Sequence, residues 1–104
     1  MLKLFTISRD KLYEAEAVYE NDEITVLKGS RINLTPGPKF KPSAVIEECL
    51  NDKSLVGGDG VLKRDVTFKS LSTAASFVTG RISNGMIIWK TEDGRYVRYT
   101  LKDK

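Results

Sequence analysis

The side chains in this sequence that could do chemistry are mainly charged, and seven of the seventeen bases lie in two stretches that lack acids. Residues 24–46 contain four bases and no acid, and residues 66–91 contain three bases and no acid. In contrast, residues 10–23 contain six acids and one base. Such asymmetry predicts a basic face opposite an acidic edge, which would attract an anionic partner such as a nucleic acid. Patterning for solubility is an equally good interpretation.

Seven residues are candidates for contact with nucleic acid. Lysine and arginine neutralise phosphates, the free amides at a helix start can hold a phosphate, and asparagine can read a base edge. The candidates are Lys28, Arg31, Lys69, Ser70, Arg81, Asn84 and Lys90. Trp89 is a further candidate, as a platform on which a base would stack.

Each of these candidates has a structural alternative. Ser70 is also the expected N-cap of a helix, and Asn84 before a glycine is typical of a turn. Arg81 follows a helix stop, where a base also interacts favourably with the helix dipole. Trp89 stands in an apolar run and is more often a core residue than a platform. The sequence alone leaves these alternatives open.

The residues that most enzymes use are missing. The sequence has no histidine, so a mechanism that needs a histidine base within one chain is excluded. Its one cysteine, Cys49, lies on the apolar side of an expected helix, which favours a buried structural thiol. Glu47 and Glu48 are adjacent in that helix, so their carboxylates do not face each other. We therefore expect no catalytic residue, no metal site and no cofactor.

The strands that must position the candidates are short and antiparallel. Residues 2–7 predict an edge strand, and residues 12–28 predict a hairpin whose first strand alternates acidic and apolar side chains. A further strand is expected near residues 61–68. Asp93–Gly94 is a strong two-residue turn, so residues 86–101 predict a second hairpin.

Two helices complete the expected α+β domain, which takes up residues 1–104 as a single unit. They are expected at about residues 43–52 and 71–79, each begun by a serine cap. Gly80 supplies the left-handed stop of the second helix. Gly85 follows an asparagine, and we expect it to take a positive φ in a turn.

An ordered set of short motifs resembles a known family. The motifs are Phe68 to Ala75, Val78-Thr-Gly-Arg81, Asn84-Gly85, Trp89-Lys90 and Asp93-Gly94. In this order they resemble the C-terminal signature of a domain family of unknown function, number four-three-five-seven in the DUF series. Val26 to Arg31 and the helix at Ile46 to Leu50 resemble that family too, so the resemblance covers about residues 13–94. The portion from the second helix to Trp89-Lys90 is also similar to the RAMA domain.

These resemblances imply a setting rather than an activity. The RAMA domain accompanies restriction enzymes and adenine methylases and is thought to sense modified DNA. The unknown-function family is often found behind GIY-YIG nuclease domains. The resemblance therefore implies a non-catalytic accessory domain near DNA, with a nuclease or methylase as a partner. Met86 stands where the family often has tryptophan, which removes an aromatic ring that could stack on a base.

Two functions from different classes fit these observations. The first is a DNA-associated accessory domain that binds nucleic acid. The second is a protein-interaction module, which docks onto a larger enzyme or self-associates through an edge strand, with the acidic first hairpin as the candidate edge. The N-terminus lacks a secretory apolar stretch, and the longest apolar run is Met86 to Trp89, far too short for a membrane span. The sequence thus predicts a cytoplasmic protein without membrane contact.

Overall fold

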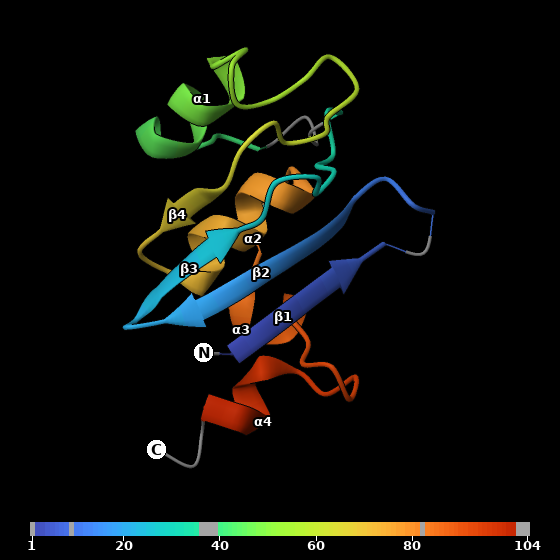
Figure 1. The fold of residues 1–104 in the computed structure, drawn as a ribbon, viewed down its shortest axis with the longest axis vertical. Helices are drawn as coiled ribbons and strands as arrows, with labels where there is room; N and C mark the ends of the chain where they lie inside the picture. The colour runs from blue at the N-terminus through green and yellow to red at the C-terminus, as the bar shows by residue number, and fades with distance from the viewer. Residues whose placement is uncertain (1, 9, 36–39, 82, 102–104) are drawn as a thin grey trace.

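The computed structural model describes residues 2–8, 10–35, 40–81 and 83–101, which form an antiparallel sheet with helices packed on one face (Figure 1). The strands, in their order across the sheet, are β1 (Leu2–Ile7), β2 (Glu14–Glu20), β3 (Glu23–Val26) and β4 (Val66–Phe68). The helices in these residues are α1 (Ala44–Asn51), α2 (Leu71–Thr79), α3 (Gly85–Ile88) and α4 (Val97–Leu101). The fold class is therefore α+β, as the sequence predicts.

The first predicted hairpin is confirmed in β2 and β3. Along β2, Ala15 and Ala17 are buried against the helices while Glu14 and Glu16 are exposed on the open face of the sheet. This alternation is what a strand with one buried face requires. Both turn residues, Asn21 and Asp22, have positive φ (54° and 62°).

The prediction that the acidic hairpin forms an edge is wrong. β2 and β3 are the two inner strands, because β1 and β4 pair with their outer sides. β1 is an edge strand, as expected, but Lys90 covers part of that edge. The amide of Phe5 donates to the carbonyl of Lys90 (2.7 Å), and the amide of Lys90 donates back to Phe5 (2.8 Å). A covered edge pairs less readily with another chain.

The strand predicted near residues 61–68 is shorter than expected. Its last part is β4, which consists of three residues. Val61 and Leu62 instead make isolated bridges with Arg31 and Val56. Residues 61–62 therefore pair with one part of the chain and residues 66–68 with β3, where one continuous strand was predicted.

The two predicted helices are confirmed, together with their caps. The Ser43 hydroxyl accepts the amide of Ile46 (3.4 Å) at the start of α1, and the Ser70 hydroxyl accepts the amide of Thr73 (3.0 Å) at the start of α2. Gly80 ends α2 in the left-handed conformation, with φ 71°. No helix among the described residues is long and apolar enough to span a membrane.

Helix α2 supplies much of the core under the sheet. Its buried side chains are Leu71, Ala74, Ala75, Phe77 and Val78. The two alanines allow the helix backbone to approach the strands closely. Phe77 packs on Phe68 of β4, with ring centroids 5.1 Å apart.

The predicted second hairpin at residues 86–101 is wrong in its strands. The first half is α3, whose N-cap is Asn84: its side-chain oxygen accepts the amide of Met86 (2.9 Å). Gly85 does not take the positive φ expected of it. Instead it presses against α2, where an added Cβ would lie 2.2 Å from the carbonyl carbon of Leu71. This close contact favours a helical turn over the extended chain that the β-branched residues favour locally.

The second half of that segment is also helical, but the turn between the halves is confirmed. Gly94 has φ 81°, and its amide donates to the carbonyl of Thr91 (2.9 Å). Lys90 and Tyr96 form a bridge across the turn. Helix α4 then buries Val97 and leaves Tyr99 exposed, so the alternation that predicted a strand does not describe which side chains are buried.

Candidate functional site

Two of the predicted nucleic-acid contacts, Lys69 and Ser70, lie at the start of α2. The Ser70 hydroxyl is within 2.7 Å of the Thr73 hydroxyl in addition to accepting the Thr73 amide. Both residues are exposed, and neither lines a hollow described below. The structure therefore supports the capping alternative for Ser70.

Lys28 and Arg31 lie together on the open face of the sheet, at a shallow hollow that they share with Glu14 and Glu16. Arg31 pairs with Glu14 through two backbone hydrogen bonds (2.8 and 2.9 Å). The guanidinium of Arg31 donates to the carbonyl of Lys11 (2.7 Å). Acids and bases are thus interleaved here, which reduces the attraction of this surface for a phosphate.

Arg81 and Asn84 flank a larger hollow of about 580 Å³ between α3 and the loop after β1. We call it the α3 hollow; its lining includes Ile7, Asp10, Tyr13, Arg81, Asn84, Ile87 and Ile88. Thr79 fixes the loop, since its hydroxyl accepts the amide of Arg81 (3.3 Å) and lies 2.8 Å from the Ser83 hydroxyl. The pKa of Asp10 is lowered, chiefly by a hydrogen bond from the Ser8 hydroxyl and further by the charge of Arg81.

Lys90 stands at the covered edge of β1. It is bridged to Phe5 on one side and to Tyr96 on the other, so the segments that carry these three residues lie side by side here. Residues directly opposite each other in antiparallel pairs project to the same face. The ammonium of Lys90 consequently lies 5.3 Å from the ring centroid of Tyr96, within range of a cation–π contact.

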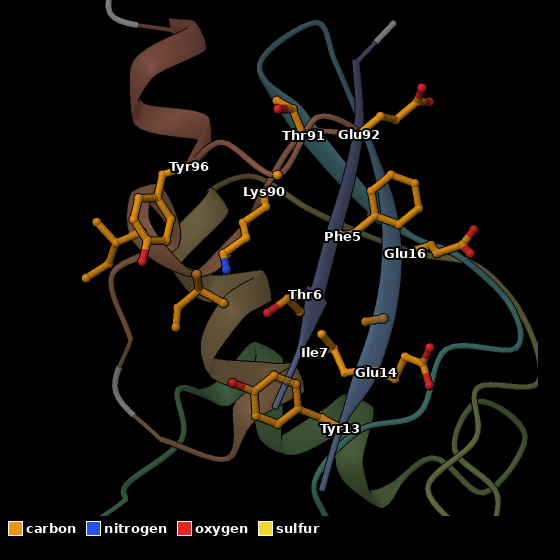
Figure 2. Close-up of a pocket in the computed structure, with 14 residues that line it drawn as sticks. Phe5, Thr6, Ile7, Tyr13, Glu14, Glu16, Lys90, Thr91, Glu92 and Tyr96 are labelled. Carbon is orange, nitrogen blue, oxygen red and sulfur yellow. The ribbon is translucent and has the colours of Figure 1, made fainter. Parts of the chain in front are cut away.

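Beside this row lies a second hollow, of about 400 Å³, which Figure 2 shows. We call it the β1-edge hollow; its lining includes Phe5, Thr6, Tyr13, Ile88, Lys90 and Tyr96. It shares Ile7, Tyr13, Ile87 and Ile88 with the α3 hollow. The two hollows therefore adjoin. We call the pair the groove; its lining extends from Arg81 and Asn84 to Lys90 and Tyr96.

The structure thus brings three of the seven predicted residues, Arg81, Asn84 and Lys90, to one groove and leaves the other four outside it. The groove also has acids in its lining, namely Asp10, Glu14, Glu16 and Glu92. The predicted separation into a basic face and an acidic edge is therefore wrong. Bases and acids alternate around this side of the molecule.

Trp89 follows the core alternative that its apolar run favours. Trp89 is fully buried, and its indole nitrogen donates to the carbonyl of Leu71 (3.1 Å), so it cannot serve as a platform for a base. The rings that line the groove are Phe5, Tyr13 and Tyr96. For Tyr96 a signal was present, because the Asp93–Gly94 turn places it opposite Lys90. Nothing in the local sequence connects Phe5 or Tyr13 to that pair.

The other side chains that could bind a metal or act as a nucleophile do not form a site among the described residues. Among the described residues, no group of three or more histidine, cysteine, aspartate or glutamate side chains is placed to hold a metal ion. Cys49 is half-buried in α1, and burial raises the pKa of its thiol. A raised pKa leaves less of the nucleophilic thiolate at neutral pH.

The comparison with known families is decisive for the chain as a whole. Residues 5–100 match the model of the domain of unknown function DUF4357. The chain belongs to the DUF4357 family. The match includes both hollows, from Phe5 to Tyr96, so the groove is formed within the DUF4357 domain itself. No curated protein and no solved structure matches the chain.

Proposed function

We propose that this DUF4357 domain is a non-catalytic accessory module that binds nucleic acid, and DNA in particular, through the groove formed by its two hollows. The observation that carries the proposal is the convergence of Arg81, Asn84 and Lys90 on that groove. These residues come from the end of α2, the start of α3 and the segment beside β1. The fold brings them to the same side of the molecule, where Tyr13 lines both hollows.

The chemistry of these side chains suits a nucleic acid. Arg81 and Lys90 are exposed cations at opposite ends of the groove, and each can neutralise a phosphate. Asn84 caps α3 with its side-chain oxygen, so the amide nitrogen is the part that would reach a base edge. The net charge of +3 adds a weak general attraction for a polyanion.

The proposal assigns no reaction to the chain. The sequence has no histidine, and the pKa of its one thiol is raised rather than lowered. Cleavage or methylation of DNA would therefore be the work of a partner. The resemblances to the DUF4357 family and to the RAMA domain suggest a nuclease or methylase as that partner, and modified DNA as one ligand. A cytoplasmic location is part of the same proposal.

Fluorescence anisotropy with labelled oligonucleotides at several salt concentrations tests the proposal. We expect wild-type protein to bind at low salt and the double variant Arg81→Ala/Lys90→Ala to bind at least tenfold more weakly. The log–log salt slope for single-stranded DNA should fall by about 1.4, because each lost phosphate contact removes about 0.7. Lys69→Ala is the matched control and should change neither value. Absence of binding at low salt would refute the proposal.

A protein-docking function is the second candidate, and the exposure of apolar side chains favours it. Around the groove, Ile7 is 58% exposed, Ile87 43% and Tyr99 55%. Such side chains, with arginine and tyrosine nearby, are typical of protein interfaces. Lys90 covers part of β1, the acidic hairpin is internal, and the other edge strand, β4, has only three residues. Docking would therefore use these side chains rather than strand pairing.

Sedimentation velocity over a range of protein concentrations tests the self-associating form of this candidate. Wild-type protein should form dimers as its concentration rises, and Ile87→Glu should shift the equilibrium towards monomer. A wild-type protein that stays monomeric at all concentrations would exclude self-association. Val45→Glu, at another exposed apolar residue outside the groove, is the matched control.

A further inference from the structure

The β1-edge hollow has a combination of walls that phosphate binding alone does not explain. We propose that it receives one unpaired nucleobase, so that the domain prefers single-stranded nucleic acid, or a base displaced from its stack, to an intact duplex. This inference rests on the proposed function and specifies its ligand. It is carried by three features of the hollow: its two tyrosine rings, its threonine hydroxyl and its lysine.

The aromatic walls come from two separate segments. Tyr13 precedes β2, and Tyr96 follows the Asp93–Gly94 turn. The ring of Phe5 lies beside Glu16, across β1 from Lys90 and Tyr96 (Figure 2). The hollow of about 400 Å³ falls within the range typical of small-molecule sites. A planar base can stack on aromatic rings whatever its identity, because every base has a π face. An unpaired base therefore suits both the size and the walls of this hollow.

The hollow also has a hydroxyl in its lining. Thr6 is 6% exposed, and Figure 2 shows its hydroxyl directed to the same side of β1 as the ammonium of Lys90. A threonine hydroxyl can both donate and accept a hydrogen bond. The edge of a base, with its own donors and acceptors, would supply a partner for it here.

The charge within the hollow is positive where a nucleotide phosphate would lie. Lys90 takes part in neither of the ion pairs that the described residues make. In Figure 2 the carboxylates of Glu14 and Glu16 point away from the Lys90 ammonium, towards the far side of β1. Lys90 is therefore available to the phosphate that flanks a bound base.

A paired base cannot make these contacts. In a duplex, base faces are covered by neighbouring pairs, and only the base edges are open in the grooves. To contact Tyr96 and the Thr6 hydroxyl together, a base has to leave the stack. Enzymes and binding proteins that handle single bases pay this unstacking energy least when the strand is already unpaired.

Anisotropy titrations with an oligothymidylate strand, and with the duplex that it forms with its complement, test the inference. We expect the single strand to bind at least tenfold more tightly than the duplex. Tyr96→Leu should weaken single-strand binding about tenfold and leave duplex binding unchanged. Thr6→Val, which keeps the side-chain shape, should act in the same direction. Tyr19→Leu replaces a tyrosine that lines neither hollow and should have no effect.

A second measurement keeps the test valid if a variant folds poorly. Thymidine monophosphate added to ¹⁵N-labelled wild-type protein should shift the amide resonances of Thr6 and Tyr96, whereas inorganic phosphate should shift Lys90 and leave Thr6 unchanged. Equal affinity for single strand and duplex, with Tyr96→Leu without effect and Arg81→Ala/Lys90→Ala weakened, would overturn this inference and leave the proposed function intact. No binding of any oligonucleotide would overturn both.

Discussion

Gly85 lies in direct contact with the first turn of α2, and this contact sets the position of α3. A Cβ at residue 85 would lie 2.2 Å from the carbonyl carbon and 2.4 Å from the carbonyl oxygen of Leu71. These are backbone atoms, so they cannot rotate away as a flexible side chain would. The amide of Gly85 also donates to the Ser72 hydroxyl (3.0 Å), which holds the two helices together.

Gly85→Ala should therefore destabilise the protein by about 3 kcal/mol, the upper part of the usual range for overpacking a core. Urea unfolding followed by Trp89 fluorescence measures the change, because the indole lies next to the same contact. Gly58→Ala is the matched control, since an added Cβ there has nothing within 4 Å. It should stay within about 0.5 kcal/mol of wild type. Equal effects at both positions would contradict the close contact.

Cys49 provides a second prediction at the residue scale. Burial raises the pKa of its thiol, and the nearby carboxylates of Glu48 and Asp52 raise it further, against the opposing effect of Arg64. The thiolate is the reactive form. Alkylation by iodoacetamide should therefore rise with pH around a higher midpoint in the folded protein than in protein unfolded by urea. A lower midpoint in the folded protein would indicate an activated thiol.

Residue types alone predicted the caps correctly, but they did not predict which side chains meet at the groove. Ser43 and Ser70 begin their helices and Gly80 ends α2 as expected, because capping depends on a few neighbouring residues. The apolar run around Trp89 favoured its burial, but its hydrogen bond to Leu71, eighteen positions away, could not be read from its neighbours. The same limit applies to Phe5 and Tyr13, whose role in the groove depends on strand pairing.

At the scale of elements, variants at the N-terminus of α2 distinguish two roles for Ser70, a helix cap and a contact with nucleic acid. The hydroxyl caps the helix, so Ser70→Ala should lower the free energy of unfolding by about 1 kcal/mol. Ser70→Asp, which can also cap, should recover most of that loss. Because Ser70 lies outside the groove, both variants should retain wild-type affinity for DNA. If Ser70→Ala also lost affinity for DNA, measured by anisotropy, Ser70 would belong to the binding site.

The elements were predicted well where the pattern is local and long enough. The first hairpin and both longer helices follow directly from alternation, helical spacing and caps. Residues 86–101 were assigned to strands because β-branched and alternating residues favour them locally. Tertiary contact decided otherwise: α3 forms against Leu71, and α4 buries Val97. The predicted turn at Asp93–Gly94 is confirmed, because a tight turn depends mainly on its own two residues.

At the scale of the whole molecule, charge along the sequence did not translate into charge on one face. The sheet is antiparallel, so acid-rich β2 lies beside segments that carry Arg31 and, through β1, Lys90. Attraction for a nucleic acid must then come from a few placed cations rather than from a continuous basic surface. Such binding should be weak and strongly dependent on Arg81 and Lys90.

The most direct test of the central claim is chemical-shift mapping of ¹⁵N-labelled protein with a single-stranded oligonucleotide at low salt. The account predicts that the shifted amides follow the groove, from Arg81 and Asn84 through Tyr13 to Lys90 and Tyr96, and weaken as salt is added. Shifts confined to Lys69 and Ser70, or to Lys28 and Arg31, would contradict the groove as the binding surface. An unchanged spectrum would contradict nucleic-acid binding altogether.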